Sequence, residues 1–472
     1  MNSLKSNSAS SSFMNFSKNF FHNIKFGFSA LLMVSLLSAC SDDDVLTGTD
    51  PTNPNNNGTT TEFVGGVYAM TNGTGQDQNP TNSVVAYGRS ADGTLTNVGS
   101  FLTGGEGGDF DGGEGLDPLI SAYALSKSDD NRFLFAANAG SNSLSVFSIN
   151  EDYTLSIADQ QPTNGTGPNT VDSYDNLVYV ANIDADGVFN GEPDQEGNLY
   201  GYWLDDAGKL APIPGSERVL ANRPSAIQFS PDGKWLAVTS INAGSAALAS
   251  GSQDELVIYA VNDDGTLSTN PWGAATSTLR GNSEGRNLPS AIGFQIVGDN
   301  YVVVTEAREF QADGTPPAFA ALQSGSVSTW QIQADGSLQA INLDVPSGNR
   351  DTESGRTACW IDFNANENIF FVSNALEAGL ASFSFSRGEI ALIDELSAEG
   401  TGAGTTTVPS EAFGRTEGWI DLWISDDGQY LYQLYGLGGT IGVYRINGNE
   451  LQLIEEVSGD LPVTNTQGIV AI

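Results

Sequence analysis

The chain has 472 residues, and its 57 acidic side chains against 18 basic ones give a formal net charge of −39 at pH 7. A charge of this sign and size excludes nucleic acid and anionic membrane surfaces as electrostatic partners. With two cysteines and one histidine in the whole chain, a zinc site built from thiolate and imidazole ligands is excluded as well. The sequence therefore predicts no metal and no other cofactor.

The first 40 residues have the features of an export signal. Three lysines precede the apolar run FGFSALLMVSLLSA (26–39), which is too short to span a bilayer and ends in small residues. The segment Leu37-Ser38-Ala39-Cys40 resembles the lipobox of bacterial lipoproteins, and an ordinary signal that happens to end in cysteine is the alternative. The resemblance implies that Cys40 carries a lipid that anchors the chain in a bacterial cell envelope. The anchor would lie in the outer membrane, with the protein either periplasmic or surface-exposed.

The mature chain that this cleavage predicts starts with an acidic tether at residues 41–62, which we expect to be disordered. It contains no histidine, keeps Cys359 as its only structural cysteine, and has a net charge of −42 because the signal carries three lysines and no acid. A disulfide between two structural cysteines is therefore excluded. We expect one folded domain over residues 63–472 that is monomeric and touches the membrane only through the lipid.

Seven repeated units fill this domain. Runs of alternating apolar residues that predict buried strands recur along the chain: GVYAMTN (66–72), FLFAAN (133–138), NLVYVAN (176–182), WLAVTS (235–240), YVVVTE (301–306), NIFFVSN (368–374) and YLYQLY (430–435). A further strand and a hairpin turn such as DGTL, DGSL or RGEI follow each run, and these turns are 52 to 71 residues apart. Another strand precedes most runs, as in SAYAL, SAIQF, SAIGF, CWIDF and GWIDLW. Four antiparallel strands per unit, without helical periodicity, predict an all-β seven-bladed β-propeller.

The two ends of the domain predict how the ring closes. The chain ends in GIVAI (468–472), which matches the first strand of a unit, whereas the first unit starts at its second strand, FVGGVYAM (63–70). We therefore expect the C-terminal strand to complete the first blade, which removes the free sheet edges of an open ring.

The repeats also resemble a known family. The segments SAIQFSPDGKWLAVTS (225–240), FLFAANAGSNSLSVFSINEDYTL (133–155) and RTACWIDFNANENIFFVSN (356–374) are similar to the seven-bladed lactonase propellers. This family includes 6-phosphogluconolactonase and 3-carboxymuconate cyclase. The resemblance implies a metal-independent lactonase or cycloisomerase. The cyclase branch implies a catalytic histidine, which the mature chain does not have. Residues 135–149 also resemble the repeats of non-catalytic surface propellers.

Arginines gather on one face of the predicted ring. If the first strand of each blade lines the axis, the connections before strand one and after strand two share a face, and all the long loops fall on it. Loops of this kind on a rigid scaffold commonly form binding sites. Four arginines precede the ends of first strands on this long-loop face: Arg223, Arg286, Arg356 and Arg415. They suggest a clamp for a small anionic ligand. Salt bridges that tether acidic loops are the alternative.

Two further residues are candidates for catalysis. Glu306 ends a second strand on the long-loop face, where a carboxylate can serve as general base toward water while Arg308 stabilises the oxyanion of a lactone. The alternative is that Glu306 only pairs with Arg308 or Arg286. Cys359 has no histidine to activate it, so a core position is expected.

Three other features have mainly structural interpretations. Trp360 and Trp419, which belong to the repeated motif GRTxxWID, are expected to pack between blades. Asp362 and Asp421 follow them and either face the channel or satisfy a neighbouring backbone. The segment DFDGGEGLD (109–117) has the acids for calcium but lacks the spacing of a calcium loop.

Two functions of different classes fit these observations. The first is a lactonase-like lipoprotein that hydrolyses or forms a small anionic lactone on the long-loop face. The second is a non-catalytic, surface-tethered propeller that binds a ligand or partner.

Overall fold

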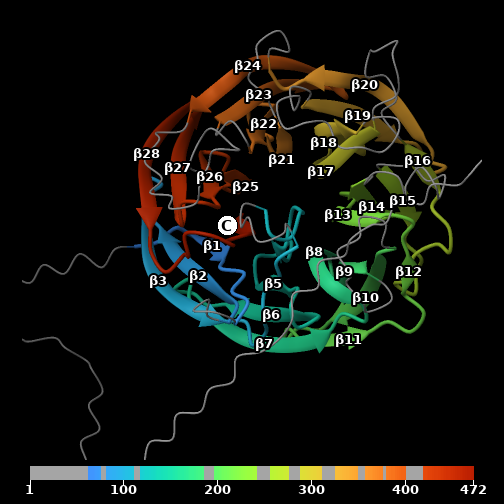
Figure 1. Ribbon diagram of the computed structural model, residues 1–472, viewed down its shortest axis with the longest axis horizontal. Helices are drawn as coiled ribbons and strands as arrows, with labels where there is room; N and C mark the ends of the chain where they lie inside the picture. Colours follow the sequence, from blue (N-terminus) through green and yellow to red (C-terminus); the bar gives the residue numbers. More distant parts are fainter. Residues whose placement is uncertain are drawn as a thin grey trace, which may run out of the picture. The chain divides into compact units, whose positions relative to one another are not determined.

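The computed structural model describes residues 62–75, 81–110, 117–184, 196–241, 256–275, 288–310, 325–348, 357–375, 379–399 and 418–472. All of them belong to one compact unit, Thr60–Ile472. The regular elements of these residues are strands, grouped into seven blades around an axis (Figure 1). Within the same residues, none forms a helix with the length and apolarity needed to cross a bilayer. The predicted seven-bladed propeller is confirmed.

The strands of the first four blades, from the axis outward, have the following bounds. Blade one contains β29 (Ile469–Ala471), β1 (Gly65–Met70), β2 (Ser83–Arg89) and β3 (Leu95–Leu102). Blade two contains β4 (Leu125–Lys127), β5 (Phe133–Asn138), β6 (Ser143–Ile149) and β7 (Leu155–Pro162). Blade three contains β8 (Thr166–Tyr174), β9 (Leu177–Asp184), β10 (Asn198–Leu204), β11 (Leu210–Pro212) and β12 (Arg218–Val219). Blade four contains β13 (Arg223–Phe229), β14 (Trp235–Ile241), β15 (Leu256–Ala260) and β16 (Gly273–Ala275).

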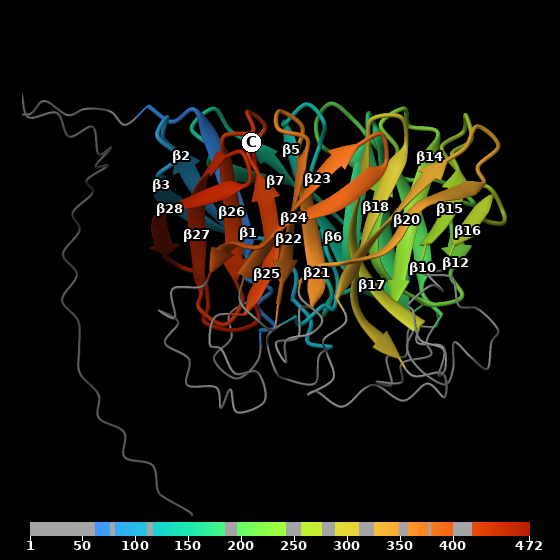
Figure 2. The same ribbon diagram turned by 90° about the horizontal axis from the view of Figure 1, so that it is seen from above.

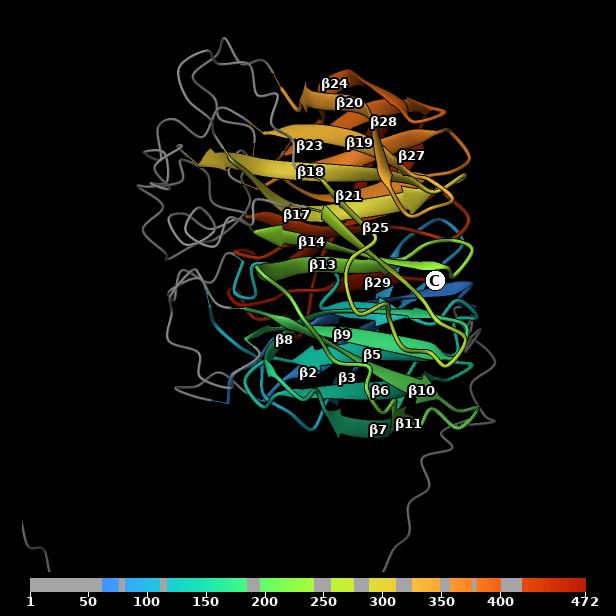
Figure 3. The ribbon, with the colours of Figure 1, turned by 90° about the vertical axis from the view of Figure 1, so that its right-hand side faces the viewer.

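The last three blades follow the same order. Blade five contains β17 (Leu288–Val297), β18 (Tyr301–Phe310), β19 (Ser326–Ile332) and β20 (Leu338–Pro346). Blade six contains β21 (Ala358–Asn364), β22 (Ile369–Asn374), β23 (Gly379–Ser386) and β24 (Glu389–Glu399). Blade seven contains β25 (Trp419–Ile424), β26 (Tyr430–Tyr435), β27 (Thr440–Asn447) and β28 (Glu450–Ser458). Blades four and five lie side by side, and one bridge between Ile241 and Ser290 joins their sheets (Figure 3).

The ring closes as the sequence predicts. β29 pairs antiparallel with β1, with Val67 opposite Ala471 and Ala69 opposite Ile469. The C-terminus therefore supplies the innermost strand of the blade that the N-terminal part of the domain begins. Figure 2 shows the C-terminus at the face opposite the long-loop face, where strand one turns into strand two. We call this the tight-turn face.

The burial of each strand follows its place in the blade. Six of the second strands are buried along their whole length, because they pack against neighbouring blades on both sides, as in β5 and β22; in the seventh, β18, Tyr301 is half-buried. The outermost strands are the least buried, and half of the residues in β3 and in β7 are exposed. Apolar side chains from adjacent blades thus form the core, and the largest fully buried ones include Trp360 and Trp419. This confirms that both tryptophans are structural.

Candidate functional site

The axis is lined by the first strand of every blade, and one position in these strands forms a ring. In blades two to seven the position lies opposite the third residue of the second strand, as Asp172 lies opposite Tyr179 and Asp362 opposite Phe371. In blade one it is taken by Ile469, which lies opposite Ala69. From blade one to blade seven it holds Ile469, Ser126, Asp172, Gln228, Gln295, Asp362 and Trp423. We call these seven residues the axial ring. Five of them are polar, although they surround the centre of the molecule.

The polar side chains of the axial ring satisfy the free inner edges of the first strands. Gln228 accepts the backbone N–H of Ile296 in the next blade at 2.6 Å. Asp172 and Asp362 accept equivalent N–H groups of the blades that follow them, at 2.7 Å each. An unpaired buried N–H would cost about as much as a lost hydrogen bond, so side chains replace the missing neighbouring strand.

These carboxyl groups titrate far from their ordinary range. Burial raises the pKa of Asp172 and of Asp362 to about 7, and hydrogen bonds from neighbouring backbone amides only partly oppose it. Asp421 accepts the N–H of Gly468 at 2.8 Å, and burial raises its pKa to about 8. The sequence leaves two roles open for Asp362 and Asp421. Both residues satisfy a neighbouring backbone N–H. Asp362 also lines the axial pocket described below.

Tyr123 crosses the axis and fills its middle. Its hydroxyl donates to the carbonyl of Phe294 at 2.7 Å and lies 3.2 Å from that of Ile361, on the far side of the ring. Gln295 donates to the same hydroxyl at 3.1 Å. Tyr123 has a φ of 63°, in the left-handed region, so the chain leaves extended geometry there. This is why β4 starts only at Leu125, two residues later, and takes in just the end of the predicted strand SAYAL (121–125).

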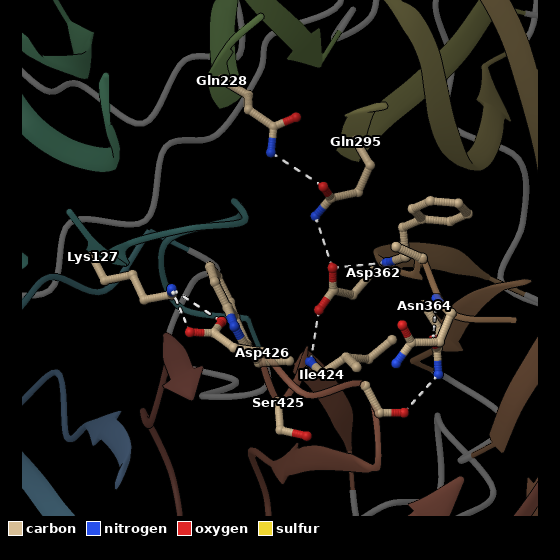
Figure 4. A pocket seen from close by; sticks show the side chains of 13 residues that line it. Lys127, Gln228, Gln295, Asp362, Asn364, Ile424, Ser425 and Asp426 are labelled. Atoms are coloured by element: carbon tan, nitrogen blue, oxygen red, sulfur yellow. Dashed lines mark hydrogen bonds and ion pairs between the residues drawn. The ribbon is translucent and has the colours of Figure 1, made fainter. Parts of the chain in front are cut away.

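A pocket opens from the axial ring toward the tight-turn face (Figure 4). Its volume is about 260 Å³. Four members of the axial ring, Gln228, Gln295, Asp362 and Trp423, contribute to its wall together with Lys127 and residues of two turns, Asn364–Asn366 and Ser425–Gly428. Lys127 binds Asn131 at 2.6 Å and Asp426 at 3.1 Å. We call this cavity the axial pocket.

Arg223 lies at the other end of the axis, at the start of β13. It donates one long hydrogen bond of 3.4 Å to the carbonyl of Leu119, and its guanidinium lies 5.8 Å from the centre of the Phe110 ring. Its Nε is buried without a hydrogen-bond partner. Burial lowers the pKa of Arg223 to about 10, although the charge of Asp117 opposes this shift. No carboxylate of the described residues forms an ion pair with it.

The other members of the predicted clamp lie outside the described residues. Arg286, Arg356 and Arg415 fall in the segments 276–287, 349–356 and 400–417, and Cys40 falls in 1–61. Arg308 lies on β18, but its side chain is outside the description. The structure therefore places one arginine of the four at the axis, and the convergence of all four stays a prediction.

Glu306 does not end its strand as the sequence suggests, because β18 continues to Phe310, and its side chain is fully buried. Its two carboxylate oxygens accept hydrogen bonds from the hydroxyls of Ser326 and of Ser328, the latter at 2.7 Å. Blade two has a counterpart with the opposite hydrogen-bond direction, in which Nδ2 of Asn138 donates to the hydroxyls of Ser143 and Ser145 at 3.2 and 2.8 Å. Both pairs of serines stand at the same positions of the third strand. The geometry of Glu306 is thus that of a residue that joins the second and third strands.

Two other predicted features can be located. Cys359 is 6% exposed within β21, in the core position that the sequence predicts. Most of the acidic segment 109–117 lies outside the described residues, and among the residues that are described, no group of three or more histidine, cysteine, aspartate or glutamate side chains could hold a metal ion.

The sequence does not single out Tyr123, Gln228, Gln295 or Lys127. A signal existed for Gln228, because IQF in SAIQF aligns with IDF in CWIDF. The same alignment gives no signal for Gln295, because SAIGF places Gly293 at the position of Gln228. In the structure, a bulge between Ala291 and Phe294 moves Gln295 into the ring position instead. A bulge between Trp419 and Leu422 likewise puts Trp423, rather than Asp421, in the ring position that Asp362 occupies.

Comparison with known proteins agrees with this fold. Residues 76–199 match the family model "Lactonase, 7-bladed beta-propeller". No curated protein matches the chain. Among solved structures, a proposed 6-phosphogluconolactonase from Bacteroides uniformis is 17% identical, with 86% of this chain and 99% of that one covered and a TM-score of 0.55.

Two further structures are similar to the same extent. A proposed 6-phosphogluconolactonase from Bacteroides fragilis is 14% identical over 88% of this chain and 99% of its own, with a TM-score of 0.56. The periplasmic gluconolactonase of Pseudomonas aeruginosa is 14% identical over 86% and 99%, with a TM-score of 0.54. Identities this low establish the fold alone. The chain is therefore a seven-bladed propeller that is similar to the lactonase family over residues 76–199.

Proposed function

We propose that this protein is a lactonase-like propeller that binds a small anionic lactone at the long-loop end of its axis, with Arg223 as the group that recognises the anion. One observation carries the proposal. Arg223 is half-buried, its Nε is buried without a hydrogen-bond partner, its guanidinium makes one long hydrogen bond, and it has no carboxylate partner among the described residues. Leaving a charge in this state is costly. A bound carboxylate or phosphate would offset the cost through charge-assisted hydrogen bonds.

The proposed activity is hydrolysis of the lactone without a metal. A general base takes a proton from water, the resulting hydroxide attacks the lactone carbonyl, and an arginine stabilises the oxyanion. The ring C–O bond then breaks, and the leaving oxygen takes up the proton, which gives a hydroxy acid. Glu306 is the proposed base and Arg308 the proposed oxyanion group. Arg286, Arg356 and Arg415 are proposed to complete the anion clamp around Arg223.

A specific observation favours a second candidate, a propeller that binds the same ligand without turnover. Both oxygens of Glu306 accept hydrogen bonds from serine hydroxyls, and in blade two Asn138 contacts the serines at the same two positions as a donor. A carboxylate held in this way already has a structural role. In this candidate, the anion site on the axis is used for recognition at the cell envelope.

Titration calorimetry with 6-phosphogluconate and with muconolactone tests the anion site, and a pH-stat assay on the corresponding lactones tests turnover. Arg223→Met should weaken binding by about 1.5 to 3 kcal/mol, because it removes a desolvated charge-assisted bond. It should not lower the melting temperature. Arg445→Met is the matched control, since Arg445 is an arginine of β27 that lies 5.1 Å from the Tyr430 ring and donates to the carbonyl of Asp92.

The outcomes separate the alternatives. Binding with hydrolysis supports the lactonase, and binding without hydrolysis supports the recognition propeller. If neither anion binds and Arg223→Met lowers the melting temperature, Arg223 is a structural tether and the proposal is wrong.

A further inference from the structure

The axial pocket has hydrogen-bonding capacity that the fold does not use. Gln228 donates one of its two side-chain N–H groups to Gln295, and the other makes no hydrogen bond within the described residues. Of the three N–H donors of Lys127, Asn131 and Asp426 take two. Trp423 also lines the pocket, and its indole N–H makes no hydrogen bond within the described part of the chain. The wall therefore presents three donors.

Acceptors alternate with these donors around the same wall. Oδ2 of Asp362 receives one N–H, from Ile424, and its second lone pair is available. The carbonyl oxygens of Gln228 and Gln295 each receive one hydrogen bond and can receive another. In Figure 4 these side chains approach one another around the cavity, so the free groups share one space.

The charges of the pocket select against anions. Lys127 is the only cationic side chain among the residues that line it, and Asp426 is paired with that charge. Asp362 adds a carboxyl group that repels a negatively charged ligand when it is ionised, above its pKa of about 7. A phosphate or carboxylate would therefore have to approach acidic groups with an already paired lysine. A neutral ligand meets no such repulsion.

One wall of the pocket is aromatic. Trp423 is half-buried and held edge-to-face against Tyr123, with 6.4 Å between the ring centres, so its position is fixed before a ligand arrives. An indole offers an apolar surface together with one polar N–H. This suits a ligand with C–H groups on one face and hydroxyl groups at its edge. A rigid, preorganised wall also reduces the entropic cost of binding.

We propose that the axial pocket binds a neutral, monosaccharide-sized polyol. Each hydroxyl of such a ligand donates and accepts one hydrogen bond, which matches the alternation of free donors and acceptors. A volume of about 260 Å³ admits a single sugar ring and leaves little space for a second. The axial pocket and the anion site at Arg223 lie at opposite ends of the axis, separated by Tyr123, so the two proposals are independent.

The test uses the folded chain and follows indole signals by NMR. The chain has seven tryptophans, and the signal that disappears in Trp423→Phe identifies Trp423. Titration with D-glucose, D-galactose and myo-inositol should shift this signal selectively. Trp423→Phe retains an aromatic ring against Tyr123 and removes the N–H, and Lys127→Met removes the ammonium. For the polyol that shifts the signal, each variant should raise the Kd measured by calorimetry about three- to tenfold, which corresponds to the loss of one hydrogen bond.

Matched controls lie outside the pocket. Trp272→Phe changes an exposed indole that packs on Trp235, and Lys234→Met removes an exposed lysine that pairs with Asp232. Neither should change binding. The proposal is wrong if none of the three polyols shifts the Trp423 signal at about 50 mM, well above a Kd of about 1 mM. It is also wrong if gluconate or choline binds there and the neutral polyols do not, or if the controls weaken binding as much as the pocket variants.

Discussion

The carboxylate of Asp362 accepts the backbone N–H of Ile424 across the boundary between blades six and seven, with 2.7 Å between Oδ2 and N. Asp172 and Asp421 make equivalent bonds to the blades that follow them. Each bond ties one blade to the next at the axis, where the first strands have no partner strand. The three carboxyl groups also share an elevated pKa, because burial disfavours their charged form.

The stability of the ring should therefore fall as the pH rises from about 4 to 8. The pKa values of Asp172, Asp362 and Asp421 are about 7, 7 and 8 in the folded chain, against an ordinary value of 3.8. Between these limits the folded state binds more protons than the unfolded state. In this range each carboxyl group lowers the free energy of unfolding by up to about 1.4 kcal/mol for every unit by which the pH rises. Calorimetry should give a higher melting temperature at pH 5.5 than at pH 8.5.

A single substitution isolates this effect. Asp421→Asn keeps an oxygen that accepts the N–H of Gly468 but cannot ionise. It should be more stable than the wild type at pH 8.5, with a smaller difference at pH 5.5. Asp92→Asn is the control, since Thr94 lowers the pKa of that exposed carboxyl, which then stays ionised throughout this range. An unchanged pH profile in Asp421→Asn would show that this group is not the source.

The fold could be predicted because it depends on patterns that repeat. Seven buried second strands, hairpin turns at similar spacing and a C-terminal segment that resembles a first strand determine the ring and its closure. The alternation of apolar residues that signals each strand also places Trp360 and Trp419 in the core. These features follow from short-range sequence and do not require knowledge of which blades touch.

The axial site could be predicted only in part, because it depends on register and on contacts across the ring. Bulges in β17 and β25 shift Gln295 and Trp423 by two residues relative to their apparent counterparts. Tyr123 reaches carbonyls more than 170 residues away in the sequence. The arginine pattern indicated the long-loop end of the axis, where Arg223 lies. It gave no sign of the axial pocket at the opposite end.

Substitution of Glu306 distinguishes a structural carboxylate from a catalytic one. Glu306→Ala removes the acceptor of two buried serine hydroxyls, and we expect a loss of about 2 to 4 kcal/mol in the free energy of unfolding. Glu306→Gln keeps one acceptor oxygen and should lose less. Asn138→Ala, at the equivalent position of blade two, should behave like Glu306→Ala. Denaturant unfolding measures all three, and a Glu306→Ala variant of full stability that has lost lactone hydrolysis would instead establish the catalytic role.

The proposed lipid anchor is tested by one residue. Cys40→Ser removes the only side chain that could carry the lipid at the predicted cleavage site, so the protein should move from the membrane fraction to the soluble fraction. Metabolic labelling with a fatty acid should mark the wild type and not the variant. Ser41→Ala is a suitable control, because it changes the neighbouring residue and keeps the cysteine. A Cys40→Ser protein that stays with the membranes would contradict the anchor.

Removal of residues 468–472 should destabilise the entire ring. These residues include β29, which pairs with β1, and they contribute apolar side chains to two core clusters through Ile469 and Val470. Their loss also removes the N–H of Gly468 that Asp421 accepts. Because each blade packs on its two neighbours, an open first blade weakens contacts on both sides of the gap. We expect one cooperative transition at a clearly lower temperature.

A shorter truncation provides the comparison. Deletion of Ile472 alone removes one backbone hydrogen bond, to Gly66, and leaves β29 intact. Because Ile472 also packs, half-buried, against an apolar cluster, this deletion should cost about 1 to 3 kcal/mol, the contribution of one hydrogen bond and part of one apolar side chain. If closure makes the seven blades one cooperative unit, the five-residue deletion must lower the free energy of unfolding by far more than five times the loss caused by deleting Ile472 alone. Equal melting temperatures for the five-residue deletion and the full chain would mean that the ring is held by the remaining blade contacts without its closing strand.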